Sequence, residues 1–284
     1  MRKRFVFLIV PSLTLVFLTG SANAAAATGG AVKAWVSNHG ADIPGCGPVS
    51  GPCRTFQYVH DHIVGSGGSI FVLDPGGYGP INITMSLSII NDGVGVAAIA
   101  PGYGTAVNIA APSDAKVMLK GLTIDGEGSG GTGVYLGTAA ALTISNCAVR
   151  GFTSTGIALG PTTVAKVAIN DTLVSDNSGD GIYFQPTAGG SDIFIDRVEV
   201  FNNTQSGIAI LGNLLSSPFA FATATITNTS ASHNGSGFYG FGGNATAVLT
   251  IVRSTASGNG QDAQNGGFAG FHYYQTLIGS TWNP

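Results

Sequence analysis

Residues suited to acid–base chemistry recur at one position of a repeated pattern. Asp176, Asn202 and His233 each lie seven residues after an isoleucine that ends a short apolar segment. A carboxylate and an imidazole are common general acids and bases, so Asp176 and His233 are catalytic candidates. Asp and Asn also favour sharp turns, and a hydrogen-bonded turn ladder is the more common reason for such a column.

A further acidic candidate is Asp180, in the run Ser178-Gly179-Asp180-Gly181. Glycoside hydrolysis requires two carboxyl groups roughly 5 to 9.5 Å apart across one cleft. This run supplies one Asp, and Asp is frequent in turns of this composition. Asp180 therefore stays a catalytic candidate without an evident partner.

The sequence does not support a metal site. Asp125, Asn170 and Asp196 each follow an isoleucine and are expected to share one outward column. Calcium requires several oxygen ligands at about 2.4 Å. Asp125 and Asp196 would lie three coils apart, or about 14 Å, too far to share an ion. We predict no metal and no other cofactor, with calcium entering only if the protein is a lyase.

Two other polar pairs have simple structural interpretations. Asp171 and Arg197 fall in one column on consecutive coils, which predicts a cross-coil ion pair. His60 and His62 lie two residues apart in a predicted helix and point to different faces, which argues against a shared metal.

A column of aromatic residues is the best candidate for binding. One residue after a recurring Gly–apolar pair, Tyr alternates with Ala at Tyr135, Ala158, Tyr183, Ala209 and Tyr239. The preceding apolar residue packs inward, so this column should face solvent, with a ring about every 10 Å. A phenol offers an apolar face and a hydrogen-bonding tip, as stacking on a sugar requires. The predicted carbohydrate-binding residues are Tyr135, Tyr183, Tyr239 and Gln185, flanked by Asp180 and Ser206. The alternative is that Tyr simply suits a strand and Ala makes room for it.

The elements that position these residues are short repeated strands. Aligned on one isoleucine, the anchors are Leu-Thr-Ile124, Leu-Thr-Ile144, Val-Ala-Ile169, Ile-Phe-Ile195, Ala-Thr-Ile226 and Leu-Thr-Ile251. A single coil cannot cover its own apolar face, whereas stacked coils bury a continuous core. A recurring Asn, at Asn177, Asn203, Asn234 and Asn259, suits the turns and can hydrogen-bond from coil to coil. The sequence therefore predicts an all-β, right-handed parallel β-helix, a single-stranded solenoid.

Composition agrees with an exported solenoid. Glycine accounts for 44 of the 284 residues and only 9% are charged. Arg2, Lys3 and Arg4, an apolar run and Ala22-Asn23-Ala24 predict a signal peptide over residues 1–24, and no second long apolar run follows. Without that peptide, 8 basic residues face 14 acidic ones, a balance that argues against nucleic acid as a partner.

Cysteine usage fits an oxidising compartment. Cys46 and Cys53 lie in a Gly/Pro-rich loop, for which a local disulfide is the natural prediction. A metal pair is less favoured, because no second Cys or His couple lies at ligand spacing. Cys147 is left over and is expected to be a buried small hydrophobe.

The two ends of the solenoid need protection. Phe56, Val59 and Ile63 share one face of a predicted capping helix with Thr55 as N-cap. We predict an N-terminal loop and cap over residues 25–69, coils over 70–267, and a C-terminal tail over 268–284.

The segments WVSNHGAD, GPCRTFQ, GGSIFVLDPGGYG, GLTIDG and GIYF resemble bacterial exported β-helix proteins of the pectin-lyase-like superfamily. The resemblance runs from about Trp35 to Gly260 and implies the fold more strongly than an activity. Related enzymes include pectate lyases and polygalacturonases, but the hydrolase motifs Asn-Thr-Asp, Asp-Asp, Gly-His-Gly and Arg-Ile-Lys are absent.

The expected function is therefore that of a secreted or periplasmic monomer that contacts polysaccharide or cell-surface glycan through an exposed strand face, without an assignable catalytic centre. A polysaccharide lyase or glycoside hydrolase with an atypical site is the first alternative. A structural or surface-interaction solenoid is the second.

Overall fold

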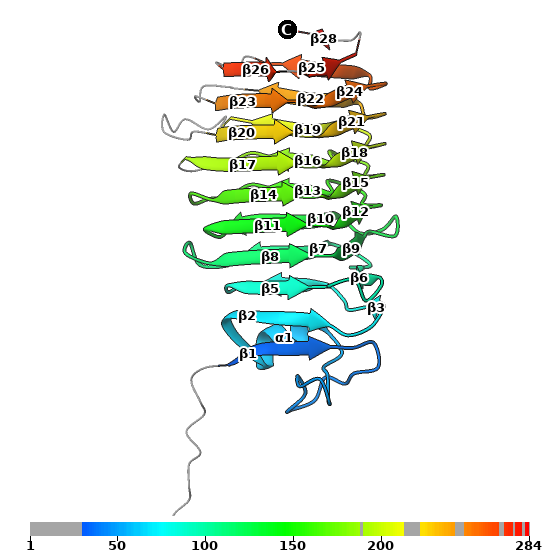
Figure 1. The fold of residues 1–284 in the computed structure, drawn as a ribbon, viewed down its shortest axis with the longest axis vertical. Helices are drawn as coiled ribbons and strands as arrows, with labels where there is room; N and C mark the ends of the chain where they lie inside the picture. The colour runs from blue at the N-terminus through cyan, green and yellow to red at the C-terminus, as the bar shows by residue number, and fades with distance from the viewer. Residues whose placement is uncertain are drawn as a thin grey trace, which may run out of the picture.

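The computed structural model describes residues 30–187, 190–212, 222–241, 247–266, 270–274, 276–279 and 282–283. It is a parallel β-helix in which each coil after the first contributes one strand to each of three sheets (Figure 1). The predicted fold class is confirmed. The predicted signal peptide lies outside the described residues.

Sheet A has ten strands, all parallel to their neighbours. In spatial order they are β1 (Ala31–Val36), β2 (Val64–Val72), β5 (Leu87–Ile90), β8 (Lys116–Lys120), β11 (Ala141–Ser145), β14 (Lys166–Asn170), β17 (Ser191–Asp196), β20 (Ala222–Thr227), β23 (Ala247–Val252) and β26 (Gly270–Tyr274).

Sheet B has nine shorter strands. They are β3 (Gly76–Gly77), β6 (Ala97–Ile99), β9 (Leu122–Asp125), β12 (Ala148–Arg150), β15 (Leu173–Ser175), β18 (Glu199–Phe201), β21 (Ser230–Ser232), β24 (Thr255–Ser257) and β27 (Leu277–Ile278).

Sheet C also has nine strands and completes each coil. They are β4 (Ile81–Ile83), β7 (Thr105–Ala110), β10 (Thr132–Thr138), β13 (Ile157–Leu159), β16 (Ile182–Phe184), β19 (Ser206–Leu211), β22 (Ser236–Phe241), β25 (Gln261–Asn265) and β28 (Trp282–Asn283).

The core lies inside the three sheets and is built from stacked apolar columns. Ile144, Ile169, Ile195 and Ile226 follow one another in sheet A, and all four are fully buried. Burying each such side chain contributes about 1.5–3 kcal/mol to the free energy of folding. Each coil in the column therefore adds a similar stabilisation.

One predicted anchor belongs to a different sheet. Ile124 lies in β9 of sheet B, where it pairs with Val149, and the residue stacked on Ile144 in sheet A is Leu119. The alignment of Ile124 with Ile144 was therefore wrong. Leu-Thr-Ile precedes a turn in both sheets, and strands of the two sheets have the same period of two, so the local pattern does not distinguish them.

The coils also extend beyond both predicted boundaries. Strand β1 already pairs with β2, although residues 25–69 were expected to form only a loop and a cap. Strands β26, β27 and β28 continue sheets A, B and C, although residues 268–284 were expected to form a tail. Parallel pairing is made by the backbone, so it tolerates coils that lack the side-chain repeat.

The N-terminal end is capped in the predicted way. Helix α1 (Phe56–His62) begins after Thr55, whose hydroxyl accepts a hydrogen bond from the Tyr58 N–H at 3.2 Å. The helix also covers the edge of sheet C. Gln57 Oε1 accepts from the Asn82 N–H at 2.7 Å, and His60 Nε2 accepts from the Thr84 N–H at 3.1 Å. These hydrogen bonds satisfy backbone N–H groups at the edge of sheet C, which would otherwise be free to pair with another strand.

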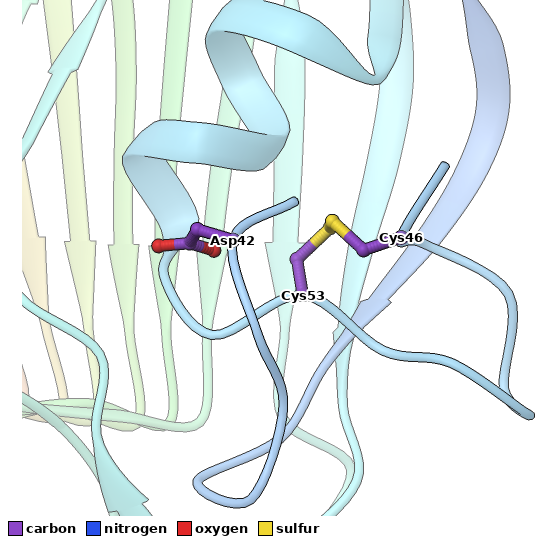
Figure 2. Close-up of side chains that lie close together, drawn as sticks. All are labelled: Asp42, Cys46 and Cys53. Carbon is purple, nitrogen blue, oxygen red and sulfur yellow. A yellow bond between two sulfur atoms is a disulfide. The ribbon is translucent and has the colours of Figure 1, made fainter. Parts of the chain in front are cut away.

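The edge of sheet A is covered by the loop that carries Cys46 and Cys53. These cysteines form a disulfide with their Cα atoms 5.0 Å apart (Figure 2). The Cys53 N–H donates to the Trp35 carbonyl at 3.0 Å, and the Ser37 N–H donates to the Cys53 carbonyl at 2.9 Å. The loop thus continues the hydrogen bonding of β1, which is the edge strand of sheet A among the residues that the structure describes. No described helix is long and apolar enough to cross a membrane.

Candidate functional site

The aromatic column forms one continuous register on sheet C. Tyr135 pairs with Ala158, Ala158 with Tyr183, Tyr183 with Ala209, and Ala209 with Tyr239. The structure extends this column in both directions with amides, which the sequence pattern did not indicate because the Gly–apolar anchor is absent in those coils. The added residues are Asn82, Asn108, Gln264 and Asn283.

The tyrosines of this column differ in exposure. Tyr135 is 42% exposed, between Val134 and Leu136, which are fully buried. Its ring lies over Gly137, with a ring carbon 3.2 Å from the position that a Cβ there would occupy. Tyr183 and Tyr239 are half-buried, and Ala209 between them is only 2% exposed. The small residues therefore give the rings room to lie close to the sheet.

Polar groups flank the rings on both sides. The Tyr183 hydroxyl donates to Gln185 Oε1 at 2.6 Å. On the other side lies Asp180, whose Oδ1 accepts from the Ser206 N–H at 2.8 Å. Burial raises the pKa of Asp180, while hydrogen bonds from Ser206 partly offset that shift. The predicted binding residues and their predicted neighbours thus lie on one surface, which we call the sheet C face.

A cleft of about 550 Å³ lies at the N-terminal end of the sheet C face. It is lined by Thr55, Gln57, Asp61, Tyr78, Gly79, Pro80, Ile81, Asn82 and Thr105. Asn108 Nδ2 donates to Asn82 Oδ1 at 3.1 Å, and Gln57 Nε2 donates to Asp61 Oδ1 at 2.9 Å. The sequence did not suggest this cleft, because it forms where the cap helix meets β4.

The Asp176–Asn202–His233 column is a turn ladder. All three residues have positive φ, at 58°, 55° and 55°, and they follow successive strands of sheet B. Asn202 Nδ2 donates to Asp176 Oδ1 and Ser175 Oγ donates to Asp176 Oδ2, both at 2.6 Å. Asp176 and His233 are two coils apart, about 10 Å, so they cannot exchange a proton directly. The geometry favours the turn interpretation over catalysis for this column.

Asp180 does not join that column. It precedes β16 at the border of sheet C, whereas Asp176 and His233 follow strands of sheet B. The three catalytic candidates therefore form no common acid–base constellation in the structure.

The recurring asparagines form the predicted buried ladder. Asn177 Nδ2 donates to Asn203 Oδ1 at 2.9 Å, and Asn203 Nδ2 donates to Asn234 Oδ1 at 2.9 Å. Asn234 continues to Asn259 at 3.0 Å, and Asn259 to Asp262 at 2.9 Å. These amides are consumed by the fold and are not available to a ligand.

Two acidic residues at the ends of sheet A strands, Asp171 and Asp196, are occupied by protein donors. Arg197 pairs with Asp171 through two bonds of 2.6 and 3.0 Å, as predicted. Asp196 accepts from Thr227, Asn228 and Arg197. The Thr227 hydrogen bond is the main cause that holds the pKa of Asp196 below its usual value. Each carboxylate thus already has its charge compensated.

Asp125 does not lie in the column predicted for it. Because Ile124 belongs to sheet B, Asp125 pairs in register with Arg150, and Arg150 Nε donates to it at 2.8 Å. Ser145, Asn170 and Asp196 do share a column in sheet A.

Among the described residues, one group of three potential metal ligands lies close together: Asp42, Cys46 and Cys53 (Figure 2). The disulfide removes both thiolates. Asp42 accepts from the N–H groups of Arg54 and Thr55 at 2.8 and 3.1 Å and from the Thr55 hydroxyl. The three residues therefore stabilise the loop through a disulfide and hydrogen bonds, and they do not fit a calcium or transition-metal site.

Cys147 is a free thiol at a buried position. Burial raises its pKa to about 11, while nearby backbone hydrogen bonds lower it only in part. The side chain is therefore an uncharged, weakly reactive group, in line with the sequence interpretation.

The sequence pattern did not indicate a polar cluster that the structure forms around Asp74. Asp74 accepts from Ser37 Oγ at 2.6 Å, from the Asn38 N–H at 2.7 Å and from the buried Tyr78 hydroxyl at 2.7 Å. His39 Nδ1 lies 3.2 Å from the same carboxylate. Burial of Asp74 opposes ionisation, yet its hydrogen bonds hold the pKa far below the usual range. Asp74 is an acceptor that ties the turn after β1 to the next coil, and the Ser37 hydroxyl is engaged as a donor to this carboxylate.

Comparison with known proteins agrees with this architecture. The model of the "Right handed beta helix region" family matches residues 105–278, so the chain belongs to that family and its coils are right-handed. The crystal structure of pectate lyase Pel9A is similar, with a TM-score of 0.61, 17% identity, and coverage of 88% of this chain and 78% of that one.

A rhamnogalacturonan lyase aligns more loosely, with a TM-score of 0.45 and 13% identity over 86% of this chain and 73% of that one. A search of curated proteins finds no match. At 17% identity, the likeness to pectate lyase Pel9A establishes the fold.

Proposed function

We propose that this protein binds a polysaccharide chain on the sheet C face, without a catalytic centre in that face. The observation that carries the proposal is the unbroken register of Tyr135, Tyr183 and Tyr239 with small residues between them. Rings recur about every 10 Å along the solenoid, so one extended chain can contact several of them at once.

The chemistry of the surroundings supports the same proposal. Amide and hydroxyl groups border the rings, and Gln185 already orients the Tyr183 hydroxyl. Sugars combine apolar ring faces with many hydroxyls, so they match an aromatic column between hydrogen-bonding groups. Export, which the N-terminal residues predict, would bring the protein to extracellular glycans.

The test is a panel of soluble glycans, with retention measured by affinity electrophoresis and product release followed by ultraviolet absorbance of unsaturated ends. We expect retention without products, weakened in both Tyr183→Ala and Tyr239→Ala. New unsaturated ends would instead establish a lyase. Retention of no glycan, or retention that both variants leave unchanged, would overturn the proposal and favour a structural solenoid.

A further inference from the structure

The basic residues of this chain are unevenly distributed along the coils. Every segment from the end of a sheet B strand to the start of the next sheet A strand contains no Lys and no Arg. These segments include the first eight strands of sheet C and the residues on either side of them, and residues 279–284, which include the ninth strand, also lack Lys and Arg. The basic residues after position 30 lie in other segments, at Lys33, Arg54, Lys116, Lys120, Arg150, Lys166, Arg197 and Arg253. Of these, Arg54 borders the N-terminal cleft, with its guanidinium 5.8 Å from the ring centre of Tyr78.

The same segments do contain acidic residues. They are Asp114, Glu127, Asp176, Asp180 and Asp262. At the N-terminal end of the face, Asp61 lines the cleft. Burial of Asp61 opposes ionisation, but hydrogen bonds from His60 and Gln57 outweigh it and hold the pKa below its usual value. Asp61, Asp114, Glu127 and Asp176 are exposed, whereas Asp180 and Asp262 are buried. The sheet C strands therefore present aromatic, amide and hydroxyl groups, and the exposed charges in the segments around them are acidic.

This charge distribution bears on the class of glycan. A polyuronate carries a carboxylate on each sugar, and binding would bring those charges onto the tyrosine column, whose strands contain no Lys or Arg. Leaving a charge partly desolvated and unpaired is costly, and neighbouring Asp side chains add repulsion. Calcium could bridge the two, but the described residues offer no carboxylate cluster on this face to hold it.

We propose that the sheet C face selects uncharged glycans and rejects polyuronates. The inference rests on the proposed function, because it concerns the same face. It separates this protein from a pectate-binding role, although its fold is similar to that of a pectate lyase.

The sharpest test compares one backbone in two charge states: polygalacturonate and its fully methyl-esterified form. At low ionic strength the esterified chain should bind at least about tenfold more tightly than the free acid. Added salt should narrow that difference, because it screens repulsion. If Lys or Arg side chains bound the free acid at this face, added salt would instead weaken its binding, and this result would contradict the proposal.

Two sets of variants tie the result to this face. Asp61→Asn and Asp180→Asn, which keep side-chain shape, should raise affinity for the free acid by a larger factor than they change affinity for the esterified chain. Tyr183→Ala should lose the esterified chain. Lys166→Gln, on sheet A, should leave esterified binding unchanged and serves as the matched control.

The outcomes separate the two proposals. Equal or tighter binding of the free acid, lost in Tyr183→Ala, overturns the charge inference while the binding proposal stands. A second outcome is free-acid binding that Tyr183→Ala leaves intact and Lys166→Gln abolishes. The free acid would then bind to sheet A, which supports the proposed selectivity of the sheet C face. Failure of every glycan, neutral ones included, overturns the binding proposal itself.

Discussion

Sheets A and C share one backbone plan and differ in what they show to solvent. Both stack parallel strands in register and bury alternate residues completely. The outer face of sheet A carries Lys116 and Lys166 in one column and Met118, Ala168 and Phe194 within another. The corresponding face of sheet C carries tyrosines, alanines and amides. Inward residues therefore maintain the solenoid, while outward residues are free to differ from sheet to sheet.

The largest expected effect tests the shared part of this comparison. Ile169→Ala in sheet A and Ile182→Ala in sheet C each empty a fully buried position of one core. Each should lower the free energy of unfolding by about 2–5 kcal/mol in urea titrations. A loss confined to one of the two sheets would contradict a single shared core.

The second prediction concerns the ladder that joins sheets B and C. Asn203→Ala removes the acceptor used by both the backbone and side chain of Asn177. Leaving these buried donors unsatisfied should cost about 2–4 kcal/mol in the same assay. The neighbouring Asn202→Gly is the control. Residue 202 has a φ of 55°, which glycine adopts readily, so we expect little change there.

The third prediction separates the two outer faces in function. Tyr183→Ala should weaken binding of an esterified or neutral glycan by about tenfold, or about 1.4 kcal/mol. Phe194→Ala removes a 43% exposed ring from sheet A and should leave glycan affinity unchanged. Isothermal titration with one oligosaccharide would measure both. An equal loss of affinity in the two variants would contradict binding at the sheet C face alone.

The smallest expected effect is the pH dependence of stability that two carboxyl groups contribute, Asp196 in sheet A and Asp180 beside sheet C. The pKa of Asp196 is lowered, so its stabilisation is present above the unfolded-state value of about 3.9 and is lost as pH falls through the lower folded-state value. The pKa of Asp180 is raised, so the opposite sign applies: its ionisation destabilises the folded state as pH rises above about 3.9.

Asp196→Asn should therefore lower stability at pH 7 and have little effect at pH 2, whereas Asp180→Asn should leave stability at pH 7 equal or higher. For Asp196→Asn we expect a change near or below about 1 kcal/mol, because its ion-pair partner Arg197 is 56% exposed and solvent screens the pair. Thermal unfolding at both pH values would measure the difference, and the same sign for both variants would contradict the assignment.

The sequence was most informative where one residue type has one physical role. Asn203 and its equivalents were identifiable because a stacked amide can satisfy both backbone and side chain of the next coil. The N-cap Thr55 and the amphipathic pattern after it predicted helix α1 from strictly local signals. The order of Tyr135, Ala158 and Tyr183 followed from a constant offset to the Gly–apolar pair.

The sequence was least informative where different contexts share a pattern. Ile124 and Ile144 carry the same Leu-Thr-Ile motif but lie in different sheets. Strands β1 and β26 pair through their backbones and lack the repeat that marked the other coils. A pattern of side chains cannot report pairing that the backbone makes by itself.

By itself, the sequence determined that apolar residues recur often enough to stack, that turns fall at Asn, Asp and Gly, and that tyrosines share one column. Those properties depend on local conformation and on period. Only the tertiary structure decided which columns become neighbours: that Asn82 and Asn108 extend the tyrosine column, and that a cleft forms between α1 and β4. It also gathered the segments that lack basic residues onto one face. Neighbouring positions in a column are about 20 to 30 residues apart in the chain, so their contact is set by coil length and backbone register, which no local pattern encodes.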